Sequence, residues 1–167
     1  MEFGLSLGSN LGDRLANLRK AKRLIGLLQQ VSITAQSSVY ETSPVDVCGE
    51  FAHLPFLNAV LLINTTRSPE MLLPEFKEIE KRLGRKAVSD RNAPRPIDID
   101  IIFAGNLRLN DGDVLIPHAR WSSRRFVVQP LNELRPDLRL PGQTRTVQEV
   151  LLTLPDDQKV VACEEVW

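Results

Sequence analysis

The sequence predicts a single α+β domain with a ferredoxin-like βαββαβ sandwich and additional C-terminal elements. Three segments show the period-two alternation of a half-buried strand, a fourth is almost wholly apolar, and two others repeat apolar residues at helical spacing. Their order along the chain is strand, helix, strand, strand, helix, strand, which is the split βαβ arrangement. The 167 residues suit one domain, and neither a linker nor a repeat divides residues 1–167.

The first third of the chain supplies a strand, a helix and a second strand. Alternation predicts a strand over residues 3–7, and the turn formers of residues 8–13 end it. Helical spacing over residues 15–28 predicts an amphipathic helix of about four turns. Alternation returns over residues 31–39, while the prolines and glycine of residues 41–55 indicate a long loop of the kind that often carries function.

The middle of the chain supplies the second half of the sandwich. Residues 56–63 are nearly all apolar, as in a strand buried on both faces. A helix is predicted over residues 68–84, from a Ser-Pro-Glu start to a terminal glycine. Pro74 removes one helical hydrogen bond, so we expect a bend there or a later start. Residues 85–96 form a polar loop, and alternation over residues 97–103 predicts the fourth strand.

The remaining residues predict the additional elements. Residues 115–118 read as a short extended piece, and a helix is expected from residue 122 or 123 to residue 134, although Pro130 counts against a regular one. Residues 146–149 form a capping box ahead of a short apolar run. Residues 160–162 suggest a last strand.

Composition excludes several classes of function. Lys+Arg and Asp+Glu both number 21, and a net charge of zero argues against a general binder of nucleic acid or membrane surfaces. Neither a membrane-spanning apolar run nor a signal peptide is present. Cys48 and Cys163 are far apart, which favours two reduced thiols. We therefore expect a cytoplasmic protein.

Asp98 and Asp100 are the most informative pair of side chains. At i and i+2 on a strand they share one face, roughly 6–7 Å apart along the backbone. Two such carboxylates repel each other unless a cation lies between them, and Mg²⁺ prefers one or two carboxylates completed by water and phosphates. Two metal ions could sit there, on either side of a transferring phosphoryl group. The alternative is simply the solvated face of a half-exposed strand.

A cluster of basic residues precedes this strand. The loop contains Arg85, Lys86, Arg91 and Arg95 against Asp90 alone. Arginine forks bind phosphate oxygens in pairs of hydrogen bonds and keep their charge. A cluster of basic residues like this one is more often a solvated charged loop. Carboxylates for a metal beside arginines for phosphate nevertheless indicate phosphoryl transfer.

Other candidate residues are less specific. His118 could donate to a phosphate or move a proton, or it could merely cap a loop. Phe56 and Phe126 would each be assigned to the core in isolation. Asn58 interrupts an apolar strand, and a heteroaromatic ligand with a donor–acceptor edge could satisfy its carboxamide. The turn at residues 8–10 could bring N–H groups near an anion, but it lacks the P-loop pattern and reads most simply as a turn.

Six motifs together resemble the 6-hydroxymethyl-7,8-dihydropterin pyrophosphokinase family, in the family's order and over nearly the whole chain. The most specific is RNAPRPIDIDII, residues 91–102. The others are LGSNLGD, SVYETSP, FLNA, IPH and RRF, which occupy residues 7–13, 38–44, 56–59, 116–118 and 124–126. The resemblance implies a single pyrophosphokinase domain of folate biosynthesis that transfers diphosphate from ATP to 6-hydroxymethyl-7,8-dihydropterin and leaves AMP.

The resemblance also implies roles for particular residues. Asp98 and Asp100 would bind two Mg²⁺ ions. The residues implied to bind ATP are Glu80, Arg85, Arg91, Arg95, Ile101, His118 and Arg124, and Arg91 and Arg95 would lie on a loop that closes over the nucleotide. The residues implied to bind the pterin are Gly8, Thr42, Ser43, Val45, Phe56, Asn58 and Phe126. Phe56 and Phe126 would stack on the two faces of the pterin, and Asn58 would read its amide edge together with main-chain groups.

The chain departs from the family pattern at several positions. Phe56 stands where a tyrosine is common, so stacking is kept and a hydroxyl contact is lost. Asn92 and Ala87 replace a tryptophan and an arginine of the closing loop. Asp113 and Leu115 replace an arginine and a threonine near the adenine pocket. These changes concern loop closure and adenine contacts, and they leave the reaction class unchanged.

Two other functions use the same features. Another Mg²⁺-dependent nucleotide enzyme, such as a cyclase, would use the aspartates without needing a pterin pocket. A ferredoxin-like RNA-binding module would use the aromatics, but the zero net charge and the acidic strand argue against it. We therefore expect small-molecule substrates alone, with neither nucleic acid nor membrane as a partner, and a monomer or weak dimer.

Overall fold

The computed structural model describes residues 1–44, 53–86, 93–111, 114–155 and 159–167. The strands are β1 (Glu2–Ser9), β2 (Val31–Gln36), β3 (Tyr40–Thr42), β4 (Phe56–Thr65), β5 (Asp98–Ala104), β6 (Leu109–Asp111), β7 (Val114–Ile116) and β8 (Val160–Ala162). The helices are α1 (Arg14–Gly26), α2 (Pro69–Arg82), α3 (Arg125–Leu134) and α4 (Val147–Thr153), with a 3₁₀ turn at Trp121–Ser123.

The main sheet has the strand order expected of a ferredoxin-like fold. The order is β5-β1-β4-β3-β8, and β2 also pairs with β4, beyond the end of β3. β1 lies between β5 and β4 and is antiparallel to both. β6 and β7 form a separate hairpin. The α+β class, the βαββαβ core and the presence of further C-terminal elements are therefore confirmed.

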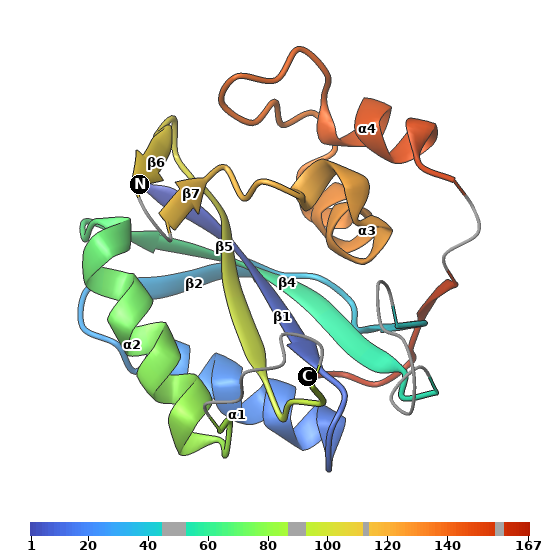
Figure 1. Ribbon diagram of the computed structural model, residues 1–167. Helices are drawn as coiled ribbons and strands as arrows, with labels where there is room; N and C mark the ends of the chain where they lie inside the picture. The colour runs from blue at the N-terminus through green and yellow to red at the C-terminus, as the bar shows by residue number, and fades with distance from the viewer. Residues whose placement is uncertain (45–52, 87–92, 112–113, 156–158) are drawn as a thin grey trace.

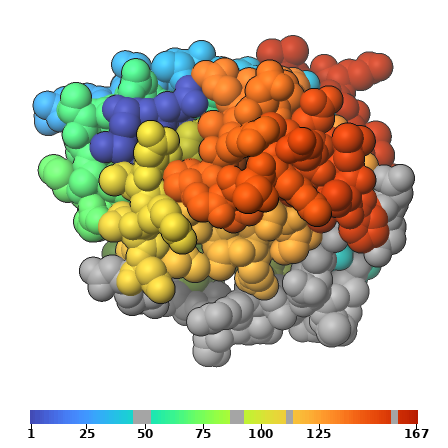
Figure 2. All heavy atoms as spheres, turned by 90° about the horizontal axis from the view of Figure 1, so that it is seen from above, coloured from blue at the N-terminus to red at the C-terminus, as the bar shows by residue number. Residues whose placement is uncertain are grey.

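Helices cover both faces of the sheet (Figure 1). α1 and α2 enclose the first core on one face, and α3, with α4 behind it, encloses the second core on the other. Alternation along β5 assigns its side chains, because Ile99 and Ile101 enter the first core while Ile102 enters the second. Asp98 and Asp100 therefore face the α3 side. From above, α3 and α4 form one continuous surface beside the β6–β7 hairpin (Figure 2).

The predicted second strand is interrupted at Ser37. The Ser37 N–H donates to the Val60 carbonyl at 2.9 Å, while the Ser37 hydroxyl accepts the Val60 N–H at 2.9 Å. A side-chain oxygen thus takes the place of a main-chain acceptor, and the strand divides into β2 and β3. The expectation of one continuous strand over residues 31–39 was wrong, because a local serine contact competes with the strand ladder.

The ends of α2 are confirmed, whereas the start of α3 differs from the prediction. α2 begins at Pro69, with Ser68 at the N-cap position, and continues past Pro74, so the alternative of a later start was wrong. The helix ends as predicted, since Gly84 has φ of 93°. The helix expected from residue 122 or 123 instead begins as a 3₁₀ turn and becomes α3 at Arg125, with Pro130 inside it. The capping box of α4 is confirmed.

Trp167 attaches the last residues of the chain to the first core. Its side chain is 5% exposed, and its indole N–H donates to the Ser37 carbonyl at 2.7 Å. The ammonium of Lys22 on α1 lies 5.0 Å from the centre of the ring. Trp167 therefore ties α1 to the break between β2 and β3.

We expect Trp167→Ala to lower the free energy of unfolding by about 3–4 kcal/mol, since it removes a buried aromatic ring and a buried hydrogen bond. Urea unfolding followed by circular dichroism measures the loss. Val166→Ala is the matched control, because the Val166 side chain is exposed and should contribute less than about 0.5 kcal/mol. Equal losses in the two variants would contradict this role.

Candidate active site

Four residues lie in register across four strands of the sheet. Asp98 of β5 pairs with Gly8 of β1, Gly8 pairs with Asn58 of β4, and Asn58 pairs with Tyr40 of β3. We call these residues the cross-strand row. Paired residues of antiparallel strands point to the same face, so the row faces α3. Neighbouring strands are about 4.8 Å apart, which places Asp98 and Asn58 roughly 10 Å from each other.

Gly8 keeps the space between these two side chains open. A Cβ atom at Gly8 would lie 2.9 Å from Asn58 Oδ1, closer than such atoms approach. Asn58 is buried, and its Nδ2 donates to Thr42 Oγ1 at 2.7 Å. This bond fixes the orientation of the carboxamide. The Oδ1 atom of Asn58 therefore lies beside the gap at Gly8.

The aromatic residues border the same end of the sheet. Phe56 is half-buried at the start of β4, opposite Thr42, and its ring lies 3.8 Å from the position of a Cβ at Gly8. Phe126 is half-buried in the first turn of α3 and packs against the second core. The Arg124 guanidinium lies 5.5 Å from the centre of the Phe126 ring. In this state the arginine covers one face of that ring.

Two arginines surround Asp98. Arg85 donates to one carboxylate oxygen and Arg95 to the other, at 3.0 Å in the case of Arg95. Burial opposes ionisation of Asp98, but the two guanidinium groups outweigh it and hold the pKa of this carboxyl below its usual value. Asp98 is therefore a carboxylate at neutral pH.

Asp100 behaves in the opposite way. Burial, with the neighbouring charge of Asp98, raises the pKa of Asp100 to about 6. Across the described residues, no cluster of three or more histidine, cysteine or acidic side chains is positioned to hold a metal. Two carboxylates on one face, one of them resisting ionisation, are a donor set that a divalent oxygen-preferring cation fits. Mg²⁺ is such a cation.

Glu80 supports the arginine cluster from beneath. Its carboxylate is 2% exposed and accepts the Ile99 N–H at 2.8 Å, and Arg85 approaches the same oxygen at 2.8 Å. Burial raises the pKa of Glu80, although Lys77, the Ile99 N–H and Arg85 oppose the shift. Glu80 was expected beside the nucleotide. In this structure it anchors Arg85.

His118 is a neutral hydrogen-bond donor. Burial first, then the charges of Arg124 and Arg120, lower the pKa of His118 to about 4. Its Nδ1 accepts the Arg120 N–H at 3.1 Å, so the proton of the neutral ring resides on Nε2. The main-chain N–H of His118 donates to the Ile102 carbonyl at 2.9 Å, which fixes the residue against β5.

Asn10 is a site residue that sequence reasoning missed. Its Oδ1 accepts the Arg95 N–H at 2.8 Å, and its own N–H donates to the Arg95 carbonyl at 3.2 Å. The turn after β1 therefore holds the main chain of Arg95, and this N–H is not available to an anion. Asparagine next to a turn has a strong local explanation, so the sequence alone gave no signal for a partner 85 positions away.

Several expected site residues are placed differently or not described. The Ile101 side chain is buried in the first core, so a contact with ATP would have to use its main chain. The main-chain N–H of Ser43 donates to the Lys159 carbonyl at 3.2 Å, so this N–H is already paired. The expected residues outside the described part of the chain are Val45, Cys48, Ala87, Arg91, Asn92 and Asp113.

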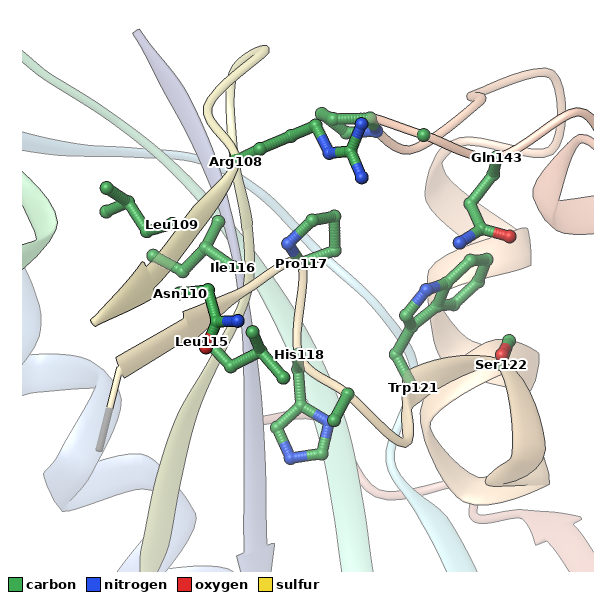
Figure 3. Close-up of a pocket in the computed structure, with 13 residues that line it drawn as sticks. Arg108, Leu109, Asn110, Leu115, Ile116, Pro117, His118, Trp121, Ser122 and Gln143 are labelled. Carbon is green, nitrogen blue, oxygen red and sulfur yellow. The ribbon is translucent and has the colours of Figure 1, made fainter. Parts of the chain in front are cut away.

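A separate pocket of about 320 Å³ lies beside the site (Figure 3). It is bordered by the β6–β7 hairpin, the 3₁₀ turn and the segment at Gln143. His118 belongs to its lining, but the ring is directed away from Arg108 and Gln143 (Figure 3). Leu115, expected near an adenine pocket, lines this space and is exposed. The pocket adjoins the carboxylate site without including either aspartate.

Comparisons with known proteins agree with the geometry. A Methylorubrum extorquens protein named 2-amino-4-hydroxy-6-hydroxymethyldihydropteridine pyrophosphokinase is 37% identical over 151 residues, which cover 90% of this chain and 91% of that protein. The mitochondrial folate synthesis bifunctional protein of Arabidopsis thaliana is 41% identical over 133 residues, or 80% of this chain and 23% of that protein. This chain thus spans about a quarter of the length of the plant relative.

A solved structure supports the fold. The Plasmodium falciparum HPPK-DHPS crystallised with pteroate superimposes with a TM-score of 0.69 at 16% identity, over 90% of this chain and 42% of that chain. In the described part of this chain, every helix is too short or too polar to cross a membrane. The family model for 7,8-dihydro-6-hydroxymethylpterin-pyrophosphokinase matches residues 4–136, and the chain belongs to this family.

Proposed function

We propose that the chain transfers diphosphate from ATP to 6-hydroxymethyl-7,8-dihydropterin, giving AMP and the pterin diphosphate, as a step of folate biosynthesis. The observation that carries this proposal is the cross-strand row, with a carboxylate at Asp98, a gap at Gly8 and a fixed carboxamide at Asn58. The backbones of Asp98 and Asn58 are roughly 10 Å apart across the sheet, a span that suits a bicyclic substrate lying between the two residues. Family membership and the pyrophosphokinase name of the Methylorubrum relative support it.

Asp98 and Asp100 would hold Mg²⁺, and we propose two ions. When bound, Mg²⁺ would neutralise phosphate charge and make the substrate hydroxyl more acidic. Asp98 is ionised across the neutral range, whereas Asp100, with a pKa of about 6, carries a proton in acid and must lose it there before it can act as a ligand. The departure of that proton links ligand binding to pH.

Arg85 and Arg95 would serve the ATP phosphates. Both now donate to Asp98, and a guanidinium donates equally well to a phosphate oxygen. Asn10 holds the main chain of Arg95, so the Arg95 side chain can turn while its base stays fixed. Glu80 holds the Arg85 guanidinium itself, which keeps that group beside the aspartates. Arg91 is proposed to act with them. His118 would donate through Nε2, with Arg124 beside it, and the main chain at Ile101 would border the nucleotide.

The pterin would occupy the gap over Gly8. Asn58 would pair with its amide edge, and the carbonyl of Ser43 with main-chain groups of Thr42 and Val45 would complete the edge contacts. Phe56 and Phe126 would stack on the ring. Arg124, whose guanidinium lies 5.5 Å from the centre of the Phe126 ring, would turn toward the phosphates when ATP binds.

The remaining features of the function are also proposals. We propose that residues 1–167 act as a single pyrophosphokinase domain, as a monomer or weak dimer, in the cytoplasm. The substrates would be small molecules, with neither nucleic acid nor membrane as a partner. The zero net charge supports the exclusion of nucleic acid.

The reaction is tested by mass spectrometry. Purified protein, ATP, Mg²⁺ and 6-hydroxymethyl-7,8-dihydropterin should yield AMP and pterin diphosphate in equal amounts, and neither product when Mg²⁺ is chelated. Asp98→Ala and Asp100→Ala should remain folded and lose at least about a thousandfold in rate. Formation of ADP, or of AMP without a pterin product, would contradict the proposed reaction.

The aspartates should affect stability in opposite directions at pH 7 without metal. Because the pKa of Asp100 is raised on folding, this residue stabilises the folded protein fully at a pH below about 4, the pKa of an unfolded aspartate. The stabilisation is lost as the pH rises through 6. Asp100→Asn should therefore stabilise the protein by about 1–2 kcal/mol, roughly 3–6 °C in Tm. Asp98→Asn should destabilise it by about 1–3 kcal/mol, because Arg85 and Arg95 lose their partner.

Thermal unfolding in EDTA at pH 7 and pH 4 measures both effects. The benefit of Asp100→Asn should shrink at pH 4, where both the folded and the unfolded wild-type chain carry more of the proton. Destabilisation by both substitutions at pH 7 would show that the repulsion between the carboxylates has been assigned wrongly.

We expect Asn58→Ala to weaken pterin binding about tenfold and to leave ATP binding within twofold, because it removes the carboxamide that faces the gap. Isothermal calorimetry with each ligand measures the difference. Asn64→Ala is the control, since Asn64 lies on the same strand with an exposed side chain. A loss in ATP affinity rather than pterin affinity would contradict the assignment of Asn58.

A further inference from the structure

One side of the α3 helix carries Phe126 and two polar residues, of which Glu133 is directed toward β3. Phe126, Gln129 and Glu133 occur at i, i+3 and i+7, so they lie on one side of the helix. The opposite side carries Val127, Val128 and Leu131, which are buried in the second core. The residue that borders the proposed pterin site, Phe126, therefore shares its side of α3 with Glu133.

Glu133 bonds to the segment that leads into β3. Its Oε2 accepts the Tyr40 hydroxyl at 2.9 Å, and its Oε1 accepts the Ser38 hydroxyl at 3.0 Å. The Ser38 N–H is 3.0 Å from both carboxylate oxygens. Gln129 interacts with the same Tyr40 hydroxyl. We call this set of contacts the Tyr40–Glu133 clasp.

The clasp joins the two sides of the proposed pterin site. Tyr40 is 8% exposed and is the last member of the cross-strand row, opposite Asn58. Thr42, which orients Asn58, follows two residues later on the same strand. Phe126 lies about two turns, or roughly 10 Å, from Glu133 along a rigid helix. The clasp therefore connects the strand that presents the Asn58 edge with the helix that carries Phe126.

We propose that Tyr40 and Glu133 are positioning residues that hold Phe126 at the correct place above the cross-strand row. This inference rests on the proposed pterin specificity of the site. Neither residue touches the substrate. Apolar packing against the second core holds α3 to the sheet but is not directional, whereas four hydrogen bonds to one carboxylate restrict rotation and sliding of the helix.

The effect on binding follows from populations. Without the clasp, α3 occupies orientations in which Phe126 is displaced, and only a fraction of molecules is ready to bind. The apparent dissociation constant rises by the inverse of that fraction. We expect a rise of about three- to tenfold when one of these hydrogen bonds is lost, because the others still hold the helix. ATP would bind to β5 and the arginines, so its affinity should not change.

Tyr40→Phe and Glu133→Gln test the proposal, because the first keeps the ring and the second keeps the shape of the side chain. Pterin and ATP affinities are measured by calorimetry, and KM and kcat by the diphosphate-transfer assay. Each variant should raise the pterin Kd and KM about three- to tenfold and leave ATP affinity and kcat within twofold. Glu75→Gln on α2, which removes a carboxylate that accepts from Arg67, is the control and should change neither affinity.

A second background separates positioning of Phe126 from general stabilisation. In Phe126→Ala the helix no longer carries a ring to place, so adding Tyr40→Phe should cause no further loss of pterin affinity. A full further loss in that background, or equal losses for pterin and ATP, would overturn the positioning role. Unchanged pterin affinity in both single variants would also overturn it. Failure of the wild-type protein to bind pterin would instead overturn the proposed function itself.

Discussion

The site depends on the register of β1 with its two antiparallel neighbours. A slip of one residue would turn every side chain of a strand to the other face, so the register is fixed by whatever buries one face. In this chain that is the first core, which takes Phe3, Leu5 and Leu7 of β1 with the matching residues of β4 and β5. The same alternation leaves Gly8 on the other face, between Asp98 and Asn58. Burial of the core and assembly of the site are thus one constraint.

The opposite face of the sheet combines apolar and charged regions. Toward one end, Val60 and Leu62 pack beneath α3 in the second core. Toward the other end, the ionised form of Asp100 raises the free energy of the folded chain, whereas Arg85 and Arg95 stabilise the carboxylate of Asp98. The negative charge at this end of the sheet would be neutralised by a bound cation. Hydrogen bonds from distant segments, through Glu80, Asn10 and Glu133, then hold the parts in place.

Periodicity predicted the features that repeat along the chain. It gave the βαββαβ order, and it placed Asp98 and Asp100 on one face, because a strand has a period of two. It could not give the break at Ser37, where a hydroxyl competes with the ladder. Nor could it give the contacts of Asn10 or Glu133, whose partners lie 85 and more than 90 positions away. Such contacts depend on how strands meet in space, and no local pattern records them.

The arrangement of the site is tested most directly by measuring the distance between the bound metal and the bound pterin across the cross-strand row. Mn²⁺ bound in place of Mg²⁺ would broaden the proton NMR signals of bound 6-hydroxymethylpterin according to their distance from Asp98 and Asp100. We expect the strongest broadening at the hydroxymethyl protons and a decline toward the amide edge, which would lie near Asn58, roughly 10 Å away. Uniform broadening, or the strongest effect at the amide edge, would contradict the arrangement of metal and pterin along this row.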